Sequence, residues 1–248
     1  MTSHRQLSML VAVKTSPGFG IVIGTLMACA VSAGRVDSAE VTITSDIGTN
    51  HVELFKVPGG RVELFNGNDF TGWTFCMRSN ADPALTWTVT NGVIHCTGKP
   101  TGYLRTVHAY HNYALTVEWR FVKVAPKADN TGILVHMQLP DQVWPMCIQN
   151  QGKHNNQGDL IFMSGAESKE HRGKDANTPV PKSGPSNEKP VSKWDTVKTV
   201  CTGNDVKAYV NGKLMNEATE CTVTSGFIGF QSEGGEFEIR RIFLEPPE

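Results

Sequence analysis

From Val62 onward the chain is a series of short runs in which hydrophobic and polar residues alternate, separated by Gly, Asn, Asp and Pro. The clearest runs are LTWTVTNGVIHC, YALTVEWRFV, NTGILVHMQ, DLIFMSG, DVKAYVNGKLMNEA and SGFIGFQSEGGEFEIRRIFLE. They have the length and the β-branched or aromatic content of strands, and no helical period of comparable length competes with them. Asn91-Gly92 and Asn211-Gly212 lie between such runs and predict tight hairpins. The pattern therefore predicts an all-β fold, either an antiparallel sandwich or a barrel.

Alternation also assigns side chains to the two faces of each predicted strand. Hydrophobic faces, predicted to pack in the core, hold Tyr113, Leu115, Val117, Trp119 and Phe121 in the first strand, Ile133, Val135 and Met137 in the second, and Met146 and Ile148 in the third. The opposite faces are polar and hold Thr116, Glu118 and Arg120, then His136 and Gln138, then Gln149 and Gln151. Three successive strands are thus predicted to present their polar groups on a single sheet face.

Planar hydrogen-bonding groups dominate this predicted polar face, which suits recognition of hydroxyls and carbonyls. Two structural alternatives stay open. Glu118 and Arg120 could form a cross-strand ion pair on a solvated face, and His136 could be a partly buried imidazole whose hydrogen bonds are satisfied. The occurrence of all these groups together favours a site.

Other candidates lie near the ends of the predicted strands. His154 and Asp159 belong to the polar turn QGKHNNQGDL, where the carboxylate of Asp159 could cap the turn or bind a ligand. Arg105 in GYLRTV and Glu233 in FQSEGG are placed where the rims of sites occur, although exposed charges are common there.

Composition divides the chain into a leader, a linker and one domain. Residues 19–33 (FGIVIGTLMACAVSA) form a short apolar stretch preceded by basic residues, which predicts a signal peptide over residues 1–33 with cleavage before Gly34. Lipidation at Cys29 and an uncleaved anchor helix are the alternatives. Residues 34–60 are predicted to be a linker leading into an edge strand, and residues 61–248 the domain. Within it, residues 165–192 are rich in Pro, Gly, Ser and charge, which predicts a long surface loop, either a lid or a solvated insertion.

Charge and cysteine content limit the partners. The 248 residues carry 23 basic and 24 acidic side chains, a formal net charge of -1, so a polyanion such as nucleic acid is not expected to bind. Export would favour disulfides, with Cys76–Cys96 and Cys201–Cys221 as possible pairs and Cys147 as a buried free thiol. The sequence contains no CxxC or HExxH motif and so demands no metal.

Several motifs in combination resemble the 3-keto-disaccharide hydrolase family. They are LFNGNDFTGW, GYLRT, VEWRF, NTGILVH, WP-x3-Q-x-Q followed by GD, DVKAYVNGKLMNEA and GFIGFQSEGGEFEIRRI, and they extend from about Val62 to Glu245. The resemblance implies a concanavalin-like jelly roll of two packed antiparallel sheets in a secreted or surface protein. It also implies cleavage of glycosides oxidised to a ketone at carbon 3, where a base removes the acidified hydrogen at carbon 2, the glycosidic oxygen leaves carbon 1, and water adds back.

The resemblance implies roles for the candidates already named. His136, Glu118 and His154 are expected to be catalytic, and the expected substrate-binding residues are Arg105, Arg120, Gln138, Gln149, Gln151, Asp159 and Glu233. Gln149 departs from the family pattern, which has Glu there; if that Glu is the catalytic base, this chain retains only binding. A divalent metal bridging His and carboxylate groups could also acidify carbon 2.

Three functions follow as hypotheses. The first is an exported enzyme that cleaves 3-keto-glycosides, with an oxidised carbohydrate as its partner. The second is a non-catalytic carbohydrate-binding module of the same fold. The third is an adhesion or scaffold domain anchored to a membrane through Cys29. Closely spaced carboxylates of the ExDxxE type are missing from VEWRF, which argues against conventional retaining glycosidase chemistry.

Overall fold

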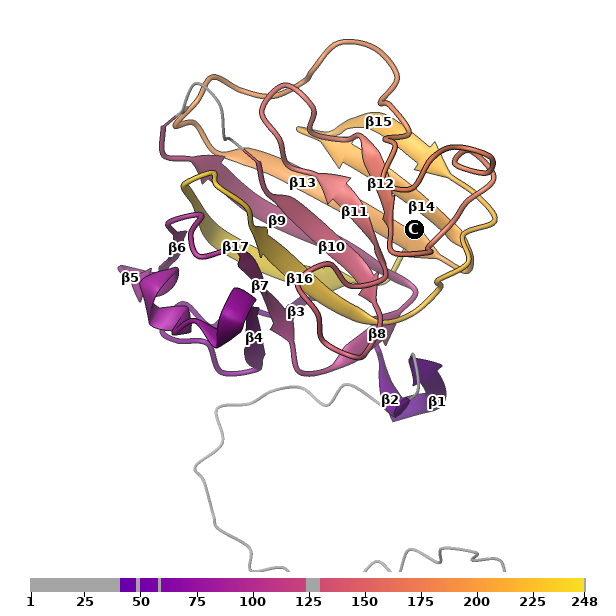
Figure 1. Ribbon diagram of the computed structural model, residues 1–248, viewed down its shortest axis with the longest axis horizontal. Helices are drawn as coiled ribbons and strands as arrows, with labels where there is room; N and C mark the ends of the chain where they lie inside the picture. Colours follow the sequence, from indigo (N-terminus) through magenta and orange to yellow (C-terminus); the bar gives the residue numbers. More distant parts are fainter. Residues whose placement is uncertain (1–40, 48–49, 58, 124–129, 248) are drawn as a thin grey trace, which may run out of the picture. The chain divides into compact units, whose positions relative to one another are not determined.

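The computed structural model describes residues 41–247 except 48–49, 58 and 124–129, and it is an all-β sandwich (Figure 1). The six-stranded sheet has the order β12-β11-β10-β16-β7-β4, with bounds Leu160–Met163, Cys147–Gln151, Gly132–Met137, Phe227–Ser232, Gly102–Thr106 and Trp73–Met77. The eight-stranded sheet has the order β15-β14-β13-β9-β17-β6-β5, with bounds Lys213–Ala218, Asp205–Val210, Asp195–Thr202, Tyr113–Phe121, Phe237–Glu245, Val93–Cys96 and Trp87–Thr90. Its eighth strand, β3 (Val62–Glu63), pairs with β17. All pairings in both sheets are antiparallel, which confirms the predicted fold class.

The remaining elements are small. β1 (Val41–Ile47), β2 (Asn50–Lys56) and β8 (Ala109–His111) form a three-stranded sheet in which β2 runs parallel to β8. Residues 34–60, predicted to be a linker, therefore contribute two strands. Two 3-10 turns, η1 (Arg78–Asn80) and η2 (Pro83–Leu85), connect β4 to β5. The predicted signal peptide, Gly34 and Cys29 lie outside the described residues, among which no helix is long and apolar enough to cross a membrane.

Both predicted hairpins are present. Asn91 and Gly92 have φ of 53° and 75° and join β5 to β6, while Asn211 and Gly212 have φ of 49° and 81° and join β14 to β15. Positive φ at both central residues matches the right-handed twist of the flanking strands.

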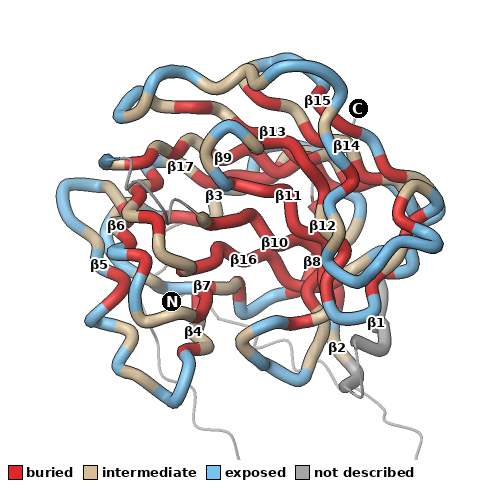
Figure 2. Tube along the Cα trace, turned by 45° about the horizontal axis from the view of Figure 1, so that its top comes forward, coloured by how far each residue is buried: buried red, intermediate tan, exposed pale blue. Residues whose placement is uncertain are grey.

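The main hydrophobic core lies between the two large sheets, and Figure 2 shows the strands as the most deeply buried part of the chain. The predicted apolar face of β9 belongs to this core, with Tyr113, Leu115, Val117, Trp119 and Phe121 at most 4% exposed. A second cluster lies on the opposite, outer face of the six-stranded sheet and includes Tyr103, Leu134, Met137, Cys147, Met163 and Phe227. Apolar residues thus occupy both faces of this sheet.

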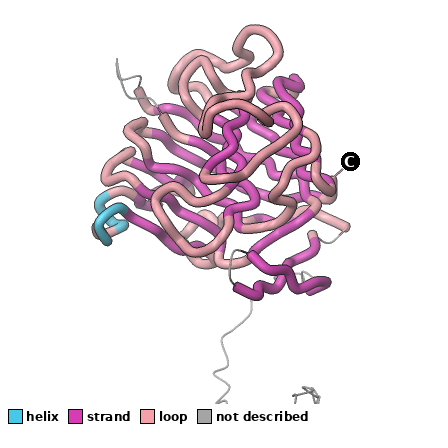
Figure 3. Tube along the Cα trace, turned by 45° about the vertical axis from the view of Figure 1, so that its right-hand side comes forward, coloured by secondary structure: helices cyan, strands magenta, loops and turns pink. Residues whose placement is uncertain are grey.

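The predicted long loop connects β12 to β13 and contains no named strand. Figure 3 shows long stretches of loop that lie beside the strands of the sandwich. The predicted loop is not fully solvated, because His171 is 1% exposed and Val180 pairs with Leu160 through an isolated bridge. Glu170 also accepts hydrogen bonds from the backbone and the hydroxyl of Thr219. The loop is therefore packed against the sandwich.

The disulfide prediction is wrong in the described structure, where all five cysteines are free. Cys76 lies in β4 of the six-stranded sheet and Cys96 in β6 of the eight-stranded sheet, so the pair is divided between the two layers. Cys201 and Cys221 are both buried in the main core as thiols, and burial raises the pKa of each to about 12. Cys147 is a buried free thiol, as predicted.

Candidate functional site

A cavity of about 410 Å³ opens on the outer face of the six-stranded sheet. We call it the amide pocket, because side-chain amides form half of its lining. The lining residues are Asn130, Trp144, Gln149, Gln151, Ile161, Met163, Ser164, Asn177, Gln231 and Glu233. Its volume lies within the range of small-molecule sites, about 300–1,000 Å³.

Three buried glutamines form the floor of the pocket. Gln149 and Gln151 alternate along β11 as predicted, and Gln231 comes from β16 on the other side of β10. The Nε2 group of Gln149 donates to Oε1 of Gln151 at 3.1 Å and, more weakly, to Oε1 of Gln231 at 3.5 Å. These bonds within the trio engage neither Oε1 of Gln149 nor Nε2 of the other two, so the floor offers one acceptor and two donor groups to a ligand.

Gly132 provides the space for this arrangement. It faces Gln151 in the β10–β11 register, and a Cβ atom at Gly132 would lie 2.4 Å from Nε2 of Gln149. Only a residue without a side chain lets the Gln149 amide lie flat over β10 and reach Gln231 on the next strand.

Glu233 supplies the ionisable group of the pocket. Among the described residues of the lining it is the one titratable side chain, and its Oε2 accepts a hydrogen bond of 2.6 Å from Nδ2 of Asn130. Burial raises the pKa of Glu233, against the opposing effect of the positive charge on Arg78. A carboxyl group with a raised pKa in a cavity is a candidate for proton transfer.

Arg105 holds the loop between β10 and β11 against the outer face. Its guanidinium forms a bidentate pair with Asp141, with both nitrogen to oxygen distances at 2.7 Å, and stacks on Phe227 at 4.3 Å. The hydroxyl of Tyr103 donates to the same carboxylate at 2.7 Å. Burial would raise the pKa of Asp141, but the hydrogen bonds from Arg105 and Tyr103 lower it overall. Arg105, predicted to lie at the rim of a site, holds Asp141 on this outer face and does not line the pocket.

The prediction that Glu118 and Arg120 share a face with Gln149 and Gln151 is wrong. β9 belongs to the eight-stranded sheet, whereas β10 and β11 belong to the other sheet. On the outer face of β9, Glu118 pairs with Arg240 and Arg120 with Glu238, each at 2.7 Å across to β17. The cross-strand ion pair, the structural alternative for these residues, is what the structure shows.

His136 is also turned away from the pocket. It has a φ of 54°, and the pairing of β10 with β16 changes register between Leu134 and Met137, as in a β-bulge. The extra residue turns the imidazole into the core, where it contacts the ring of Tyr113 and Nδ1 donates to the Val223 carbonyl at 3.0 Å. It also moves Met137 to the outer face, against the prediction that Met137 packs with Ile133 and Val135.

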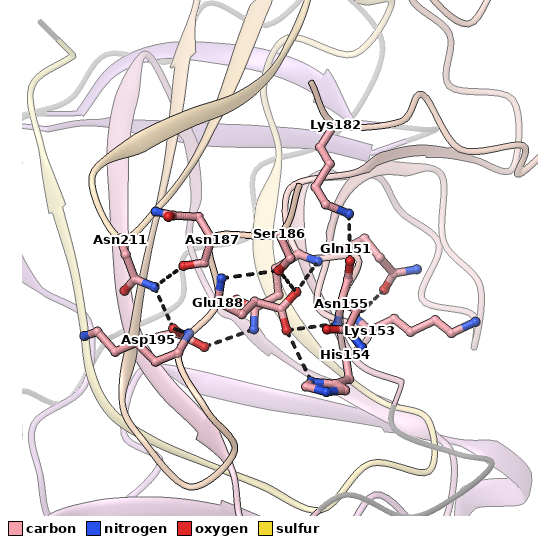
Figure 4. A network of polar contacts seen from close by, with 12 residues as sticks. Gln151, Lys153, His154, Asn155, Lys182, Ser186, Asn187, Glu188, Asp195 and Asn211 are labelled. Carbon is pink, nitrogen blue, oxygen red and sulfur yellow. Dashed lines mark hydrogen bonds and ion pairs between the residues drawn. The ribbon is translucent and has the colours of Figure 1, made fainter. Parts of the chain in front are cut away.

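His154 is part of a polar network that joins two loops (Figure 4). Its Nδ1 lies 3.3 Å from the buried carboxylate of Glu188, which also accepts hydrogen bonds from the backbone N–H groups of Asn155 and Gln157. The network fastens the end of the long loop to the turn after β11 and does not line the pocket.

Gln138 and Asp159 have structural partners too. Nε2 of Gln138 donates to the carbonyl oxygens of His136 and Ser225. Asp159 accepts hydrogen bonds from the backbone N–H of Lys182 and from Nδ2 of Asn156, so it braces the turn, the alternative to ligand binding. Of the ten predicted site residues, Gln149, Gln151 and Glu233 line the amide pocket.

A larger hollow of about 520 Å³ lies on the outer face of the eight-stranded sheet. Its lining consists mainly of lysine and threonine side chains that alternate outward along β9, β13 and β14, with Tyr209 and Asp205. Such a composition is typical of a solvated sheet face. It lacks the buried amides and the carboxyl group with a raised pKa that distinguish the amide pocket.

The described residues contain no recognisable metal-binding centre. Within residues 41–247, apart from the gaps given above, no group of three or more His, Cys, Asp and Glu side chains is arranged to hold a metal ion.

Comparisons with known proteins support the fold. Two candidate glycosyl hydrolases from Parabacteroides distasonis ATCC 8503 have similar structures. The first is 19% identical with a TM-score of 0.57 and covers 76% of this chain and 94% of that one. The second is 16% identical with a TM-score of 0.53 and covers 75% of this chain and 99% of that one. The carbohydrate recognition domain of Emp46p is 11% identical with a TM-score of 0.52, and the match covers 74% of this chain and 94% of that one. At these identities the likeness establishes the jelly-roll fold.

The family assignment rests on the sequence. A search of curated proteins finds no match. The model of the 3-keto-alpha-glucoside-1,2-lyase-like domain matches residues 60–245, which covers the whole sandwich from β3 to β17. The resemblance predicted from the motifs is thereby confirmed, and the chain belongs to the 3-keto-alpha-glucoside-1,2-lyase-like family.

Proposed function

We propose that the amide pocket binds a glycoside oxidised at carbon 3 and that the protein cleaves it by elimination followed by hydration. The observation that carries this proposal is the convergence of three buried glutamine amides and Glu233 on one cavity. Uncharged donors and acceptors at fixed positions match the hydroxyl and carbonyl groups of a neutral sugar. Membership of the family supports the same class of ligand.

Glu233 is the group in this pocket that can move a proton. A ketone at carbon 3 acidifies the hydrogen at carbon 2, so the carboxylate of Glu233 can remove it while the negative charge collects on the ketone oxygen. Nε2 of Gln151 and Nε2 of Gln231 are the donors available to that oxygen. The carbon 1 to oxygen bond then breaks, and the proton held by Glu233 passes to the leaving oxygen. Water adds across the resulting double bond, with hydroxyl to carbon 1 and hydrogen to carbon 2, so the net reaction is hydrolysis.

The roles expected for His136, Glu118 and His154 pass to Glu233 in this proposal, because those three side chains lie outside the pocket. Gln149 takes a binding role, since an amide cannot act as a base at neutral pH. A non-catalytic carbohydrate-binding module remains the second candidate function, favoured by Gln149 in the floor of the pocket, where the motif resemblance implies Glu.

The test is to incubate the purified protein with a 3-keto-disaccharide and with the unoxidised parent disaccharide, each with and without a chelator. Release of a free sugar from the 3-keto compound alone is the expected result, because only the ketone makes the hydrogen at carbon 2 acidic. Saturable binding without turnover would assign the protein to the binding modules. Failure to bind either sugar would overturn the proposal, and loss of turnover with chelator would add a metal to the site.

A substitution at Gly132 tests the glutamine floor. Gly132→Ala should weaken binding of the 3-keto-disaccharide about tenfold, because the new methyl group displaces the Gln149 amide and breaks its hydrogen bonds to Gln151 and Gln231. Isothermal titration calorimetry measures the change. Gly152→Ala is the matched control, since its added Cβ would meet Thr131 and not the glutamines. Equal losses in the two variants would show that the effect is general and not due to Gln149.

We further propose that the protein is exported to the periplasm or the cell exterior. The apolar residues 19–33, with basic residues before them, support this proposal. The mass of the N-terminal peptide of the native protein is the test: a mature chain starting at Gly34 is expected, a lipidated Cys29 would indicate a membrane anchor, and an intact Met1 would contradict processing.

A further inference from the structure

Trp144 differs from the other four tryptophans of the chain. Trp73, Trp87 and Trp119 are in the core and at most 7% exposed. Trp194 contacts the guanidinium groups of Arg120 and Arg240, which lie over its ring at 4.3 and 4.6 Å from the ring centroid. Trp144 is 36% exposed and lines the amide pocket. Because its exposed indole lies in the lining of a cavity that also holds three buried amides, a ligand bound in this cavity would cover it.

The segment that carries Trp144 is fastened on both sides. Toward the N-terminus, Asp141 is held by Arg105 and Tyr103 on β7, the next strand but one from β10. At Trp144 itself, the backbone carbonyl accepts a 2.8 Å hydrogen bond from the hydroxyl of Ser164, which also lines the pocket. Two residues after Trp144, the carbonyl of Met146 accepts a hydrogen bond from the backbone N–H of Gln138. The indole is therefore presented at the pocket by a braced loop, which lowers the entropy lost on binding.

We propose that Trp144 is the platform on which a pyranose ring of the substrate stacks. This inference rests on the proposed function. A pyranose carries C–H groups on its faces and hydroxyls around its rim, and the electron-rich face of an indole attracts such C–H groups. The stacked ring directs its rim toward the amides of Gln149, Gln151 and Gln231. The pocket thus provides one apolar wall, the indole, and one polar floor, the amides. A cyclic sugar can stack on the indole and hydrogen-bond to the amides, whereas an open-chain polyol can only hydrogen-bond to the amides.

The experiment uses ligand NMR and calorimetry with a 3-keto-disaccharide and the Glu233→Gln protein, so that the sugar is not consumed. Sugar C–H protons that lie over the indole should shift upfield on binding, an effect that arises from the aromatic ring itself. Adding Trp144→Ala should abolish the upfield shifts and weaken binding about tenfold, whereas Trp144→Phe should retain a part of both. Trp194→Ala, which removes a tryptophan that packs on Arg120 and Arg240 of the other sheet, is the matched control and should change neither.

The outcomes separate this inference from the proposed function. Upfield shifts and affinity that persist in Trp144→Ala would overturn the platform and leave the sugar site standing. Absence of sugar binding both in the wild type and in Glu233→Gln would overturn the proposed function and the platform with it. Equal losses in Trp144→Ala and Trp194→Ala would also overturn the platform, because the effect would then not depend on the pocket.

Discussion

Glu233→Gln should lower kcat for cleavage of a 3-keto-disaccharide by about 10²- to 10⁴-fold, the contribution typical of a positioned acid or base. The amide has nearly the shape of the carboxylate and keeps an oxygen to accept from Nδ2 of Asn130. It cannot take the proton from carbon 2. Binding of the sugar should therefore change little, and single-turnover kinetics together with calorimetry measure the two quantities separately.

The pH dependence of turnover provides a second measure of the same residue. Because burial raises the pKa of Glu233, the carboxylate form needed as a base is lost as the pH falls through a value above that of an ordinary carboxyl group. The acid limb of the pH profile of kcat/KM should therefore lie at a higher pH than for an ordinary carboxylate base. Arg78 lowers the pKa of Glu233, so Arg78→Gln should move this limb to still higher pH.

Glu236→Gln is the matched control for Glu233→Gln. Glu236 lies three residues further along the chain and pairs with His95 and Lys123 at the edge of the eight-stranded sheet, away from the amide pocket. Its loss should leave kcat unchanged. Full activity in Glu233→Gln would show that another group performs the proton transfer, and equal inhibition by the two substitutions would point to a general effect on the fold.

Local sequence rules predicted much of this fold because they describe short-range geometry. Alternation located the buried face of β9 from Tyr113 to Phe121, and the Asn-Gly pairs located two hairpins. Alternation does not reveal which sheet a strand joins. The chain crosses from one sheet to the other between β9 and β10, so Glu118 and Gln149 lie on opposite sides of the sandwich although each alternates correctly within its own strand.

The candidate site was only partly predictable for related reasons. Gln231 could have been found, because alternation in SGFIGFQSEGG places it on one face with Phe227 and Gly229, but its relation to Gln149 depends on β10 lying between the two strands. Trp144 comes from a loop, where no periodicity indicates direction. The bulge at His136 exchanges the faces of His136 and Met137 and has no signal in the hydrophobic pattern.

His136 should make the fold sensitive to acid. Its side chain is 1% exposed, Nδ1 is engaged by the Val223 carbonyl, and Nε2 is buried with no partner among the described residues. Desolvation is the main cause that lowers its pKa from 6.5 to about 4; the Val223 carbonyl opposes this change, and the nearby His111 adds to it. An imidazolium here would place a second N–H donor in the core without an acceptor.

The sign of the effect follows from proton binding in the two states. Between about pH 6.5 and pH 4 the unfolded chain binds a proton at His136 and the folded chain does not, so the free energy of unfolding falls as the pH is lowered through this window. At about 1.4 kcal/mol for each unit of pKa, the loss amounts to about 3 kcal/mol and is complete below the folded-state pKa. Urea unfolding at a series of pH values measures it.

A variant at this position separates His136 from the other titrating groups. Asn tolerates a φ of 54° and can donate to the Val223 carbonyl, so His136→Asn should fold, with a lower stability at neutral pH and a shallower loss between pH 6.5 and pH 4. In NMR spectra of the wild type, the Cε1–H signal of His136, assigned by its absence from His136→Asn, should not titrate above pH 5. Identical pH profiles for the wild type and His136→Asn would mean that this imidazole is not held neutral by the fold. Water or a counter-ion would then have to reach the imidazole in the core between β9 and β10.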